Sequence, residues 1–405
     1  MKRTCLFGHK KSLKILSENL EMFSFGRKEL NFSICKDCGF IYQSKTVEPS
    51  EMRNYYEKSI VAFDNLYKPT SDKVKSVARH INIIKDEMSV FPKSVLEISC
   101  LNSYVLKQFK KNGTKVIEGL EPSKIIAKGL KEKEKIRIHN TTIEKFKFKK
   151  SYDLIILTHV LEHLYDPLNV LRKCFKSQKN NQYVLLEVPL FDNIESYPNG
   201  TFFLEHLSYF SENNFLKLVE LSGYKTVYIS KTFESTVLPF ITIIAKKNQK
   251  KNTKGNLWFN DFKSFKNLKL KNNENTKIQN KDFKKQHANA KKFLKINKSL
   301  WGQINKRINK FDKQKSIYIY GAGFHGSQLL CNTDIEKRFN IEGFIDSSKA
   351  KDGGYVGKYK IFNPLSNKIK SSSNIVICSN YSESAIYKSL NSFRKKGMKT
   401  YKIYN

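Results

Sequence analysis

The chain contains 405 residues, with 74 Lys or Arg against 37 Asp or Glu, which gives a formal net charge of +37. A chain of this length can bury two or three hydrophobic cores, so a single small domain is excluded. No apolar run approaches the roughly 20 residues of a membrane-spanning helix, and the basic N-terminus leads into Cys5 rather than into an apolar signal-peptide core. We therefore expect a cytoplasmic protein without a membrane partner.

The positive charge is spread along the whole chain, and Lys and Asn are accompanied throughout by Ile, Phe and Tyr. This pattern is typical of a compositionally biased genome and lacks the focused basic stripe of a nucleic-acid-binding protein. We therefore do not expect nucleic acid as a partner, although the charge would attract an anionic substrate such as a nucleotide diphosphate. Seven dispersed cysteines, an odd number, argue against a disulfide framework and favour burial or metal ligation.

Residues 1–90 contain four candidate zinc ligands. Cys35 and Cys38 are three residues apart and are followed by a glycine, a spacing with which two thiolates hold one tetrahedral Zn2+. In one interpretation Cys5 and His9 complete the set of four ligands; in the other, Cys5 is an exposed thiol and His9 a surface residue. We expect this segment to have little core of its own and to gain folding free energy from the metal.

Residues 91–247, which follow a helix predicted over residues 71–88, alternate between apolar strand patterns and amphipathic helix patterns. This alternation predicts an α/β fold with a parallel sheet and helices on both faces. The expected strands cover residues 94–98, 115–120, 136–139, 152–158, 182–188, 224–230 and 238–245. The last two strands follow a helix over residues 211–222, and their short connection predicts an antiparallel pair.

Polar side chains gather where three of these strands end. Glu97 lies near the end of the first strand and is followed by Ser99, Glu121 follows the second, and the sequence from His159 to His163 follows a third. The carboxyl ends of neighbouring strands in an open α/β sheet line one crevice, where ligands bind. An acidic residue after the second strand suits the two hydroxyls of a ribose, so the pattern predicts a cofactor that carries a nucleoside.

These segments resemble the motifs of class I S-adenosylmethionine-dependent methyltransferases. The resemblance implies that Glu97 lies near the methionine part of S-adenosylmethionine and that Glu121 holds its ribose, with Ser99 and His159 in the same crevice. The family usually has a glycine-rich turn after the first strand, whereas residues 99–103 contain no glycine. We therefore expect less room for the cofactor or a different turn. The alternative is that the carboxylates cap helices or are solvated and that His159 only packs.

A second resemblance rests on residues 201–210, where Glu205 and His206 are followed by Ser-Tyr-Phe. It is a resemblance to sugar C-methyltransferases that act on nucleotide-linked keto-deoxysugars, and it extends to the N- and C-terminal parts of the chain. The resemblance implies that His206 is the general base, that Glu205 orients it and that His163 lies across the same cleft. Tyr67 is an aromatic residue that we expect to contact the substrate.

The expected chemistry needs such a base. Removing a proton alpha to a ketone requires a group whose pKa lies near the working pH, which histidine provides, while methyl transfer itself mainly needs in-line positioning. Phe203 and Leu204 stand where the family commonly has Tyr and His, so a hydroxyl for stabilising an enolate is missing. We expect C-methylation, and O-methylation stays open.

Residues 248–312 are rich in Lys and Asn, which predicts a linker of exposed, partly helical segments or a flexible connector. In residues 313–405, Gly321, Gly323 and Gly326 form a G-x-G-x-x-G motif between a strand and a helix, and the next strand ends in Asp346. In isolation this pattern predicts a dinucleotide site. The resemblance instead implies a Rossmann-like domain whose turn is structural or helps to hold the nucleotide sugar.

The sequence thus predicts an α/β protein with a class I methyltransferase sheet, an N-terminal zinc-binding segment and a second, C-terminal Rossmann-like domain. Its expected function is methyl transfer from S-adenosylmethionine to a nucleotide-diphosphate sugar, in surface-polysaccharide or deoxysugar biosynthesis. An NAD-dependent nucleotide-sugar enzyme and a non-catalytic scaffold with a degenerate crevice are the alternatives. The sequence indicates neither the sugar nor the oligomeric state.

Overall fold

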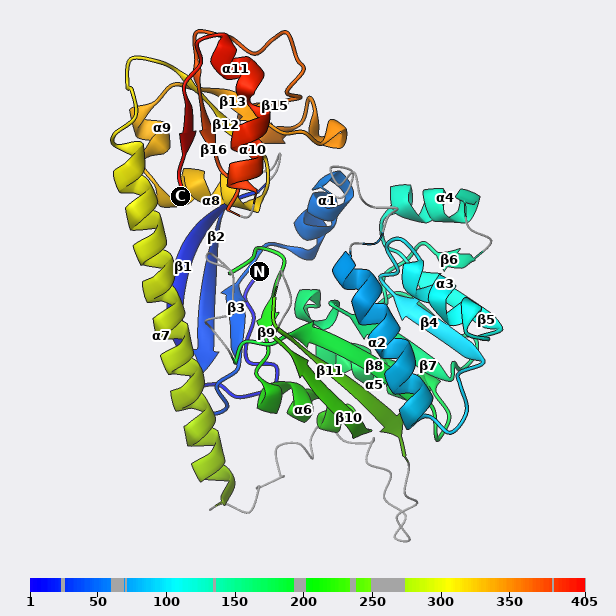
Figure 1. The fold of residues 1–405 in the computed structure, drawn as a ribbon. Helices are drawn as coiled ribbons and strands as arrows, with labels where there is room; N and C mark the ends of the chain where they lie inside the picture. The colour runs from blue at the N-terminus through cyan, green and yellow to red at the C-terminus, as the bar shows by residue number, and fades with distance from the viewer. Residues whose placement is uncertain are drawn as a thin grey trace.

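A computed structural model of the chain contains three β-sheets and a long helix that runs beside two of them (Figure 1). It describes residues 1–22, 26–59, 69, 71–133, 136–192, 202–233, 238–248, 274–380 and 382–404. Tyr67, the residue expected at the substrate, lies outside the described residues.

The largest sheet has seven strands in the order β10-β11-β8-β7-β4-β5-β6. Five strands are parallel, and β11 runs antiparallel to both β8 and β10, which confirms the predicted parallel sheet and its antiparallel final pair. In sheet order the strands are β10 Tyr224–Thr232, β11 Phe240–Lys247, β8 Tyr183–Pro189, β7 Leu154–Thr158, β4 Ser94–Ile98, β5 Val116–Leu120 and β6 Arg137–His139.

Helices cover both faces of this sheet, as the alternating sequence pattern predicts. Because successive strand residues point to opposite faces, Val95 packs with α2, α3 and α4, whereas Leu96 packs with α5 and α6. These helices are α2 Ser71–Glu87, α3 Tyr104–Lys111, α4 Lys124–Lys133, α5 Pro167–Ser177 and α6 Glu212–Leu221, with the short 3-10 helix η2 Leu161–His163 after β7.

The N-terminal segment forms a second, antiparallel sheet of β1 Ser12–Met22, β2 Gly26–Cys35 and β3 Ile41–Lys45, followed by helix α1 Pro49–Ser59. Its fourth strand, β9 Ser208–Tyr209, comes from a distant part of the chain. Leu30, Phe32 and Ile34 of this sheet are fully buried. They pack against side chains from later segments, which the local sequence could not reveal.

Helix α7, Glu274–Ile308, lies between the predicted domains in the sequence. At 1.5 Å per residue it is about 50 Å long, and it runs along the side of the molecule in Figure 1. Phe293, near its middle, packs into the core beside the N-terminal sheet, while Trp301, Ile304 and Ile308 belong to the core of the C-terminal sheet. The aromatic residues between 258 and 265 lie outside the described residues.

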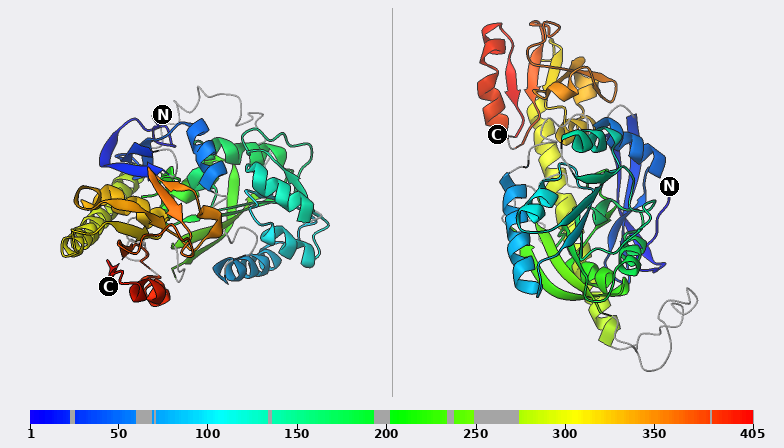
Figure 2. Two further views of the ribbon diagram at one scale, coloured as in Figure 1. Left: turned by 90° about the horizontal axis from the view of Figure 1, so that it is seen from above. Right: turned by 90° about the vertical axis from the view of Figure 1, so that its right-hand side faces the viewer.

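The C-terminal sheet has the order β14-β15-β13-β12-β16-β17, and all neighbours except β14 and β15 are parallel. This is the strand order of a doubly wound, Rossmann-like sheet. Figure 2 shows it at one end of the molecule. Its elements are β12 Ile317–Tyr320, α8 Phe324–Asn332, α9 Ile335–Arg338, β13 Ile341–Ile345, η5 Lys349–Lys351, β14 Tyr355–Val356, β15 Tyr359–Phe362, β16 Asn374–Ile377, α10 Glu383–Ser389, α11 Asn391–Lys395 and β17 Thr400–Lys402.

Candidate active site

The turn after β4 adopts the backbone shape of a glycine-rich turn without containing glycine. Ser99, Leu101 and Ser103 have φ angles of 61°, 39° and 54°, and His159, after β7, has a φ of 54°. Left-handed conformations cost residues with a side chain about 1–2 kcal/mol each. Among the described residues only one other non-glycine position, far from these strand ends, has a positive φ. Backbone strain is therefore concentrated in the crevice that the sequence singled out.

Cys100 fills the space behind this turn. Its side chain is buried, and a Cβ added at Gly119 of β5 would lie 2.5 Å from the Cys100 Sγ atom. Glycine at position 119 therefore makes room for the cysteine. The turn differs from the family pattern through its side chains, because the exposed Leu101 adds bulk where a glycine would leave open space.

Glu121 holds the turn to the end of β5. Its carboxylate accepts hydrogen bonds from the backbone amides of Leu101, at 3.1 Å, and of Ser123, at 2.9 Å. Burial raises the pKa of Glu121 to about 7. The carboxylate lies at the strand end predicted for ribose binding, although both of its oxygens already accept an amide hydrogen.

Glu97 is 3% exposed and lies inside the same crevice. Its Oε2 atom has no hydrogen-bond partner among the described residues. Burial raises the pKa of Glu97 to about 8, although the charge of Lys73 on α2 opposes this shift. A buried carboxyl oxygen without a partner is suited to a cationic ligand group, such as the ammonium of an amino acid.

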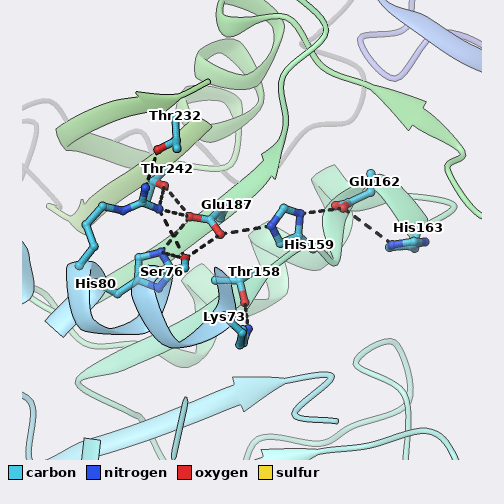
Figure 3. Close-up of polar contacts among 11 residues, drawn as sticks. Lys73, Ser76, His80, Thr158, His159, Glu162, His163, Glu187, Thr232 and Thr242 are labelled. Atoms are coloured by element: carbon cyan, nitrogen blue, oxygen red, sulfur yellow. Dashed lines mark hydrogen bonds and ion pairs between the residues drawn. The ribbon is translucent and has the colours of Figure 1, made fainter. Parts of the chain in front are cut away.

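His159 lies between two carboxylates, as Figure 3 shows. Its Nε2 atom is 3.2 Å from Glu187 Oε1 on β8, and its Nδ1 atom is 3.6 Å from Glu162 Oε1 on η2. These contacts fix the plane of the imidazole at the crevice. The sequence left packing as the alternative role of His159, whereas the structure gives it two ion-pair contacts.

Sequence reasoning missed Glu187, whose side chain joins α2 to the central sheet. The buried carboxylate accepts hydrogen bonds from Arg79 Nη2 at 2.9 Å and Thr242 Oγ1 at 2.6 Å, and it lies 2.8 Å from His80 Nε2 (Figure 3). Burial opposes ionisation, but His80 and His159 outweigh it and hold the pKa of Glu187 well below its usual range. The signal in the sequence was that Glu187 is the single charged residue of an otherwise apolar strand.

Two distant segments meet at η2. The backbone amide of Leu207 donates to the carbonyl oxygen of Glu162 at 2.8 Å, so the loop before β9 lies beside η2. His163 and His206 consequently face each other, with ring centroids 4.8 Å apart. The structure thus brings together His163, Glu205 and His206, the three residues that the resemblance assigned to catalysis.

Gln43 of β3 holds this loop in place and was not anticipated. Its buried Nε2 atom lies 2.9 Å from each of three carbonyl oxygens, those of Phe203, Leu204 and His206. Arg3 donates to the carbonyl oxygen of Leu207 through Nη1. The N-terminal sheet therefore positions the loop that carries the candidate base.

Two tyrosines of α1 contact Glu205 and His163, the residues expected to assist His206. The Tyr55 hydroxyl donates to Glu205 Oε1 at 2.5 Å, and the Tyr56 hydroxyl lies 3.0 Å from His163 Nδ1. The carbonyl oxygen of Glu205 is also 3.0 Å from this nitrogen. Within the described residues, the Glu205 carboxylate has no ion pair or hydrogen bond with His206, and it accepts a hydrogen bond from the Tyr55 phenol instead.

Phe203 joins the candidate base to the C-terminal domain. Its ring centroid lies 4.8 Å from that of His206 and 4.8 Å from that of Phe324. Phe324 is the first residue of α8 and belongs to the G-x-G-x-x-G turn. Burial, together with the charge of His163, lowers the pKa of His206 to about 3, so the His206 imidazole is neutral at neutral pH.

The three glycines of the C-terminal turn have different surroundings. A Cβ at Gly321 would lie 2.5 Å from the Cys378 carbonyl oxygen, and one at Gly326 would lie 2.5 Å from the Gly321 carbonyl oxygen. A Cβ at Gly323 would meet nothing within 4 Å. Packing therefore explains two of the glycines, while the third borders open space.

Asp346, which the dinucleotide interpretation assigns to a ribose, has several partners within the protein. Its carboxylate accepts hydrogen bonds from the backbone amides of Ala322 and Ser348 and from Lys351 Nζ, at 2.9, 3.0 and 3.0 Å. It therefore ties the glycine turn to the following segment.

The four candidate zinc ligands lie together, with one donor atom from each within 4.8 Å of the others. Cys5 Sγ is 3.7 Å from His9 Nδ1 and 3.7 Å from Cys38 Sγ, and Cys35 Sγ is 3.4 Å from His9 Nδ1. All three thiols are free and buried. Three sulfurs and one imidazole at this spacing fit a closed tetrahedral zinc site.

Comparison with known proteins finds similarities for the central region of the chain. Residues 32–229, just under half of the chain, match the family model described as "Methyltransferase domain". Ubiquinone biosynthesis O-methyltransferases of Aliivibrio fischeri and Vibrio campbellii are 26% and 27% identical to this chain, over 38% of its length and 68% of theirs.

Solved structures with a similar arrangement include two methyltransferases with bound S-adenosylhomocysteine. One is the N-methyltransferase NodS from Bradyrhizobium japonicum WM9, with 12% identity, a TM-score of 0.40, and coverage of 49% of this chain and 99% of that one. The other is magnesium protoporphyrin IX methyltransferase from Synechocystis PCC 6803, with 11% identity, a TM-score of 0.39, and coverage of 50% and 100%. No helix among the described residues is long and apolar enough to cross a membrane.

Proposed function

We propose that the protein is a class I S-adenosylmethionine-dependent methyltransferase that methylates a nucleotide-linked keto-deoxysugar, which is supported by the match of residues 32–229 to a methyltransferase domain. S-adenosylmethionine supplies the methyl group when it is bound at the ends of β4, β5 and β7. In this proposal Glu121 holds the ribose, Glu97 receives the ammonium of the methionine part, and Ser99 and His159 line the crevice.

The observation that carries the proposal is the position of Phe203, whose ring contacts both His206 and Phe324. A substrate with a sugar at one end and a diphosphate at the other needs a catalytic group and an anion-binding turn close together. The turn around Gly323 is the proposed diphosphate contact, since it opens helix α8 and a Cβ there would meet nothing within 4 Å. Gly321 and Gly326 shape this turn, and Tyr67 is the further proposed sugar contact.

His206 is the proposed general base for the proton alpha to the sugar ketone. Its lowered pKa keeps the imidazole unprotonated at neutral pH, which is the form that accepts a proton, but a pKa of about 3 also makes it a weaker base than an ordinary histidine. His163 lies beside it at a centroid distance of 4.8 Å. The proposed role of Glu205 is to position its neighbours. Its carbonyl oxygen contacts the His163 ring, and its carboxylate accepts a hydrogen bond from the Tyr55 hydroxyl.

The N-terminal cluster of Cys5, His9, Cys35 and Cys38 is the proposed zinc site, supported by the spacing of its four donor atoms. Zinc there would be structural, since three thiolates and one imidazole leave no open coordination position. The same sheet carries Gln43, so the metal would support the loop that carries His206.

O-methylation is the second candidate reaction, and Phe203 favours it. The ring beside His206 carries no hydroxyl with which to stabilise an enolate oxygen. In that reaction the base would deprotonate a sugar hydroxyl while the hydroxyl attacks the methyl group. No carbon-bound hydrogen would then exchange with solvent.

The two reactions differ in solvent exchange. The full-length protein is incubated in deuterated buffer with S-adenosylhomocysteine and a nucleotide-linked keto-deoxysugar, and deuterium at the alpha carbon is measured by mass spectrometry. We expect exchange with the wild type, none with His206→Gln, and unchanged exchange with the control His287→Gln on α7. Methylation by His206→Gln at near the wild-type rate would contradict this base and transfer the role to His163.

A further inference from the structure

A second group of metal-ligand side chains lies within the candidate active site, apart from the cysteine cluster. Glu162, His163 and His206 each offer one donor atom, and these atoms all lie within 4.8 Å of one another. The hydrogen bond between the Leu207 amide and the Glu162 carbonyl oxygen fixes η2 against the loop that carries His206. Divalent ions bind such ligands at about 2.0–2.2 Å, so small adjustments would bring all three atoms onto one ion.

The buried carboxylate of Glu162 has ion-pair contacts but no hydrogen bond of ordinary length among the described residues. The residue is 1% exposed, and neither oxygen has a hydrogen-bond partner among the described residues. The contacting nitrogens, His159 Nδ1 and His163 Nε2, lie 3.6 and 3.8 Å from Oε1, which is longer than an ordinary hydrogen bond. Burying a carboxylate that has only these long ion-pair contacts and no hydrogen bond is costly, so this position favours a further cation.

The hydrogen bonding of His163 supports the same conclusion. Its Nδ1 atom is 3.0 Å from the carbonyl oxygen of Glu205, which can only accept, and 3.0 Å from the Tyr56 hydroxyl, which can accept as well, so a neutral ring with its proton on Nδ1 is compatible with both neighbours. In that tautomer the lone pair on Nε2 lies near the Glu162 carboxylate, which is also a hydrogen-bond acceptor. A histidine whose far nitrogen donates to a carbonyl oxygen is typically oriented in this way toward a metal ion.

We propose that Glu162, His163 and His206 bind one divalent transition-metal cation through one carboxylate oxygen and two imidazole nitrogens. Two histidines and one carboxylate suit Mn2+, Fe2+, Co2+ or Zn2+, and they leave coordination positions open for water or a substrate oxygen. The proposal shares His206 with the function above but needs neither a sugar nor S-adenosylmethionine. Because the ion takes the His206 lone pair, ion binding and proton abstraction by His206 exclude each other.

Manganese is the suitable probe, because this hard ion prefers oxygen and nitrogen ligands to the thiolates of the cysteine cluster. Zinc-loaded, full-length protein is titrated with Mn2+ alone, and free Mn2+ is measured by electron paramagnetic resonance. We expect one bound Mn2+ per chain. His163→Ala, His206→Ala and Glu162→Gln should each weaken binding at least about tenfold, which is the scale reported for groups around metal sites.

Glu205→Gln is the matched control, since it alters a neighbouring carboxylate while keeping the backbone carbonyl that orients His163. It should bind Mn2+ like the wild type. Thermal melting with and without Mn2+ gives a second readout, in which the ion should raise the midpoint of the wild type and not that of the three ligand variants. Absence of Mn2+ binding at about 1 mM, or equal binding by wild type and ligand variants, would overturn the proposal.

Discussion

The side-chain nitrogen of Gln43 lies 2.9 Å from the carbonyl oxygen of His206, although 162 residues of the chain separate the two. The same nitrogen contacts the carbonyl oxygens of Phe203 and Leu204. The N-terminal sheet thereby holds the loop that carries the candidate base.

Replacing this amide should impair catalysis more than cofactor binding. In Gln43→Leu the volume is nearly kept, but three carbonyl oxygens lose their donor, which should lower the free energy of unfolding by about 1–3 kcal/mol. We expect a fall in kcat with little change in the affinity for S-adenosylhomocysteine, measured by steady-state kinetics and calorimetry. Gln303→Leu, at an exposed amide on α7, is the control and should match the wild type. An unchanged kcat in Gln43→Leu would show that catalysis does not depend on the hydrogen bonds by which Gln43 holds the loop.

Cofactor affinity should depend on the ionisation of Glu97. Burial raises the pKa of Glu97 to about 8, so in the free protein most of this carboxyl is protonated at neutral pH. If the ionised form receives the cofactor's ammonium, the affinity for S-adenosylhomocysteine should rise roughly tenfold per pH unit between about pH 6 and about pH 7.5. Calorimetry measures this slope. Glu97→Gln should bind more weakly and without the slope, and a variant with the wild-type slope would assign the titration to another group.

The raised pKa of Glu97 also predicts how the stability of the protein changes with pH. Its pKa is higher in the folded than in the unfolded chain, so between these two values the folded state binds more protons. The contribution of Glu97 to stability is therefore complete at low pH and is lost as the pH rises toward about 8. Without cofactor, the Tm of Glu97→Gln should fall less over this range than the Tm of the wild type.

Zinc should be present at one ion per chain and should stabilise the N-terminal sheet. Elemental analysis of Cys35→Ser combined with Cys38→Ser should show loss of the ion, and the Tm should fall because a structural metal contributes folding free energy. Cys331→Ser alters a cysteine outside the cluster and should keep the metal. An unchanged zinc content in the double variant would remove this site.

The open space at Gly323 permits a test of the proposed diphosphate contact. Gly323→Asp would place a carboxylate at the start of α8 and repel a diphosphate, so the KM for the nucleotide sugar should rise at least about tenfold with little change in Tm. Gly323→Ala should be close to neutral for stability. Gly326→Ala should instead destabilise the domain, because its Cβ would lie 2.5 Å from the Gly321 carbonyl oxygen. An equal KM for Gly323→Asp and the wild type would exclude a diphosphate at this turn.

The central sheet could be predicted from the sequence because its information is local. Most of the parallel strands are short apolar runs, and β4, β5 and β7 are followed at the crevice by the polar residues Ser99, Glu121 and His159. The sequence also identified the glycine-free turn as a departure from the family. It did not indicate that Ser99, Leu101 and Ser103 keep left-handed backbone conformations, since that depends on how Cys100 and Glu121 hold the turn from outside.

Only the tertiary structure decided how the candidate catalytic groups are paired. The resemblance implied that Glu205 orients His206, yet the Glu205 carboxylate accepts a hydrogen bond from Tyr55. Gln43 and Glu187 belong to no motif that the sequence showed. The pattern of side chains along a strand or helix reports which face is buried, and it is set by neighbours a few residues away. Hydrogen bonds such as that between Gln43 and His206 join segments whose approach depends on the packing of three sheets and α7, so no local pattern encodes them.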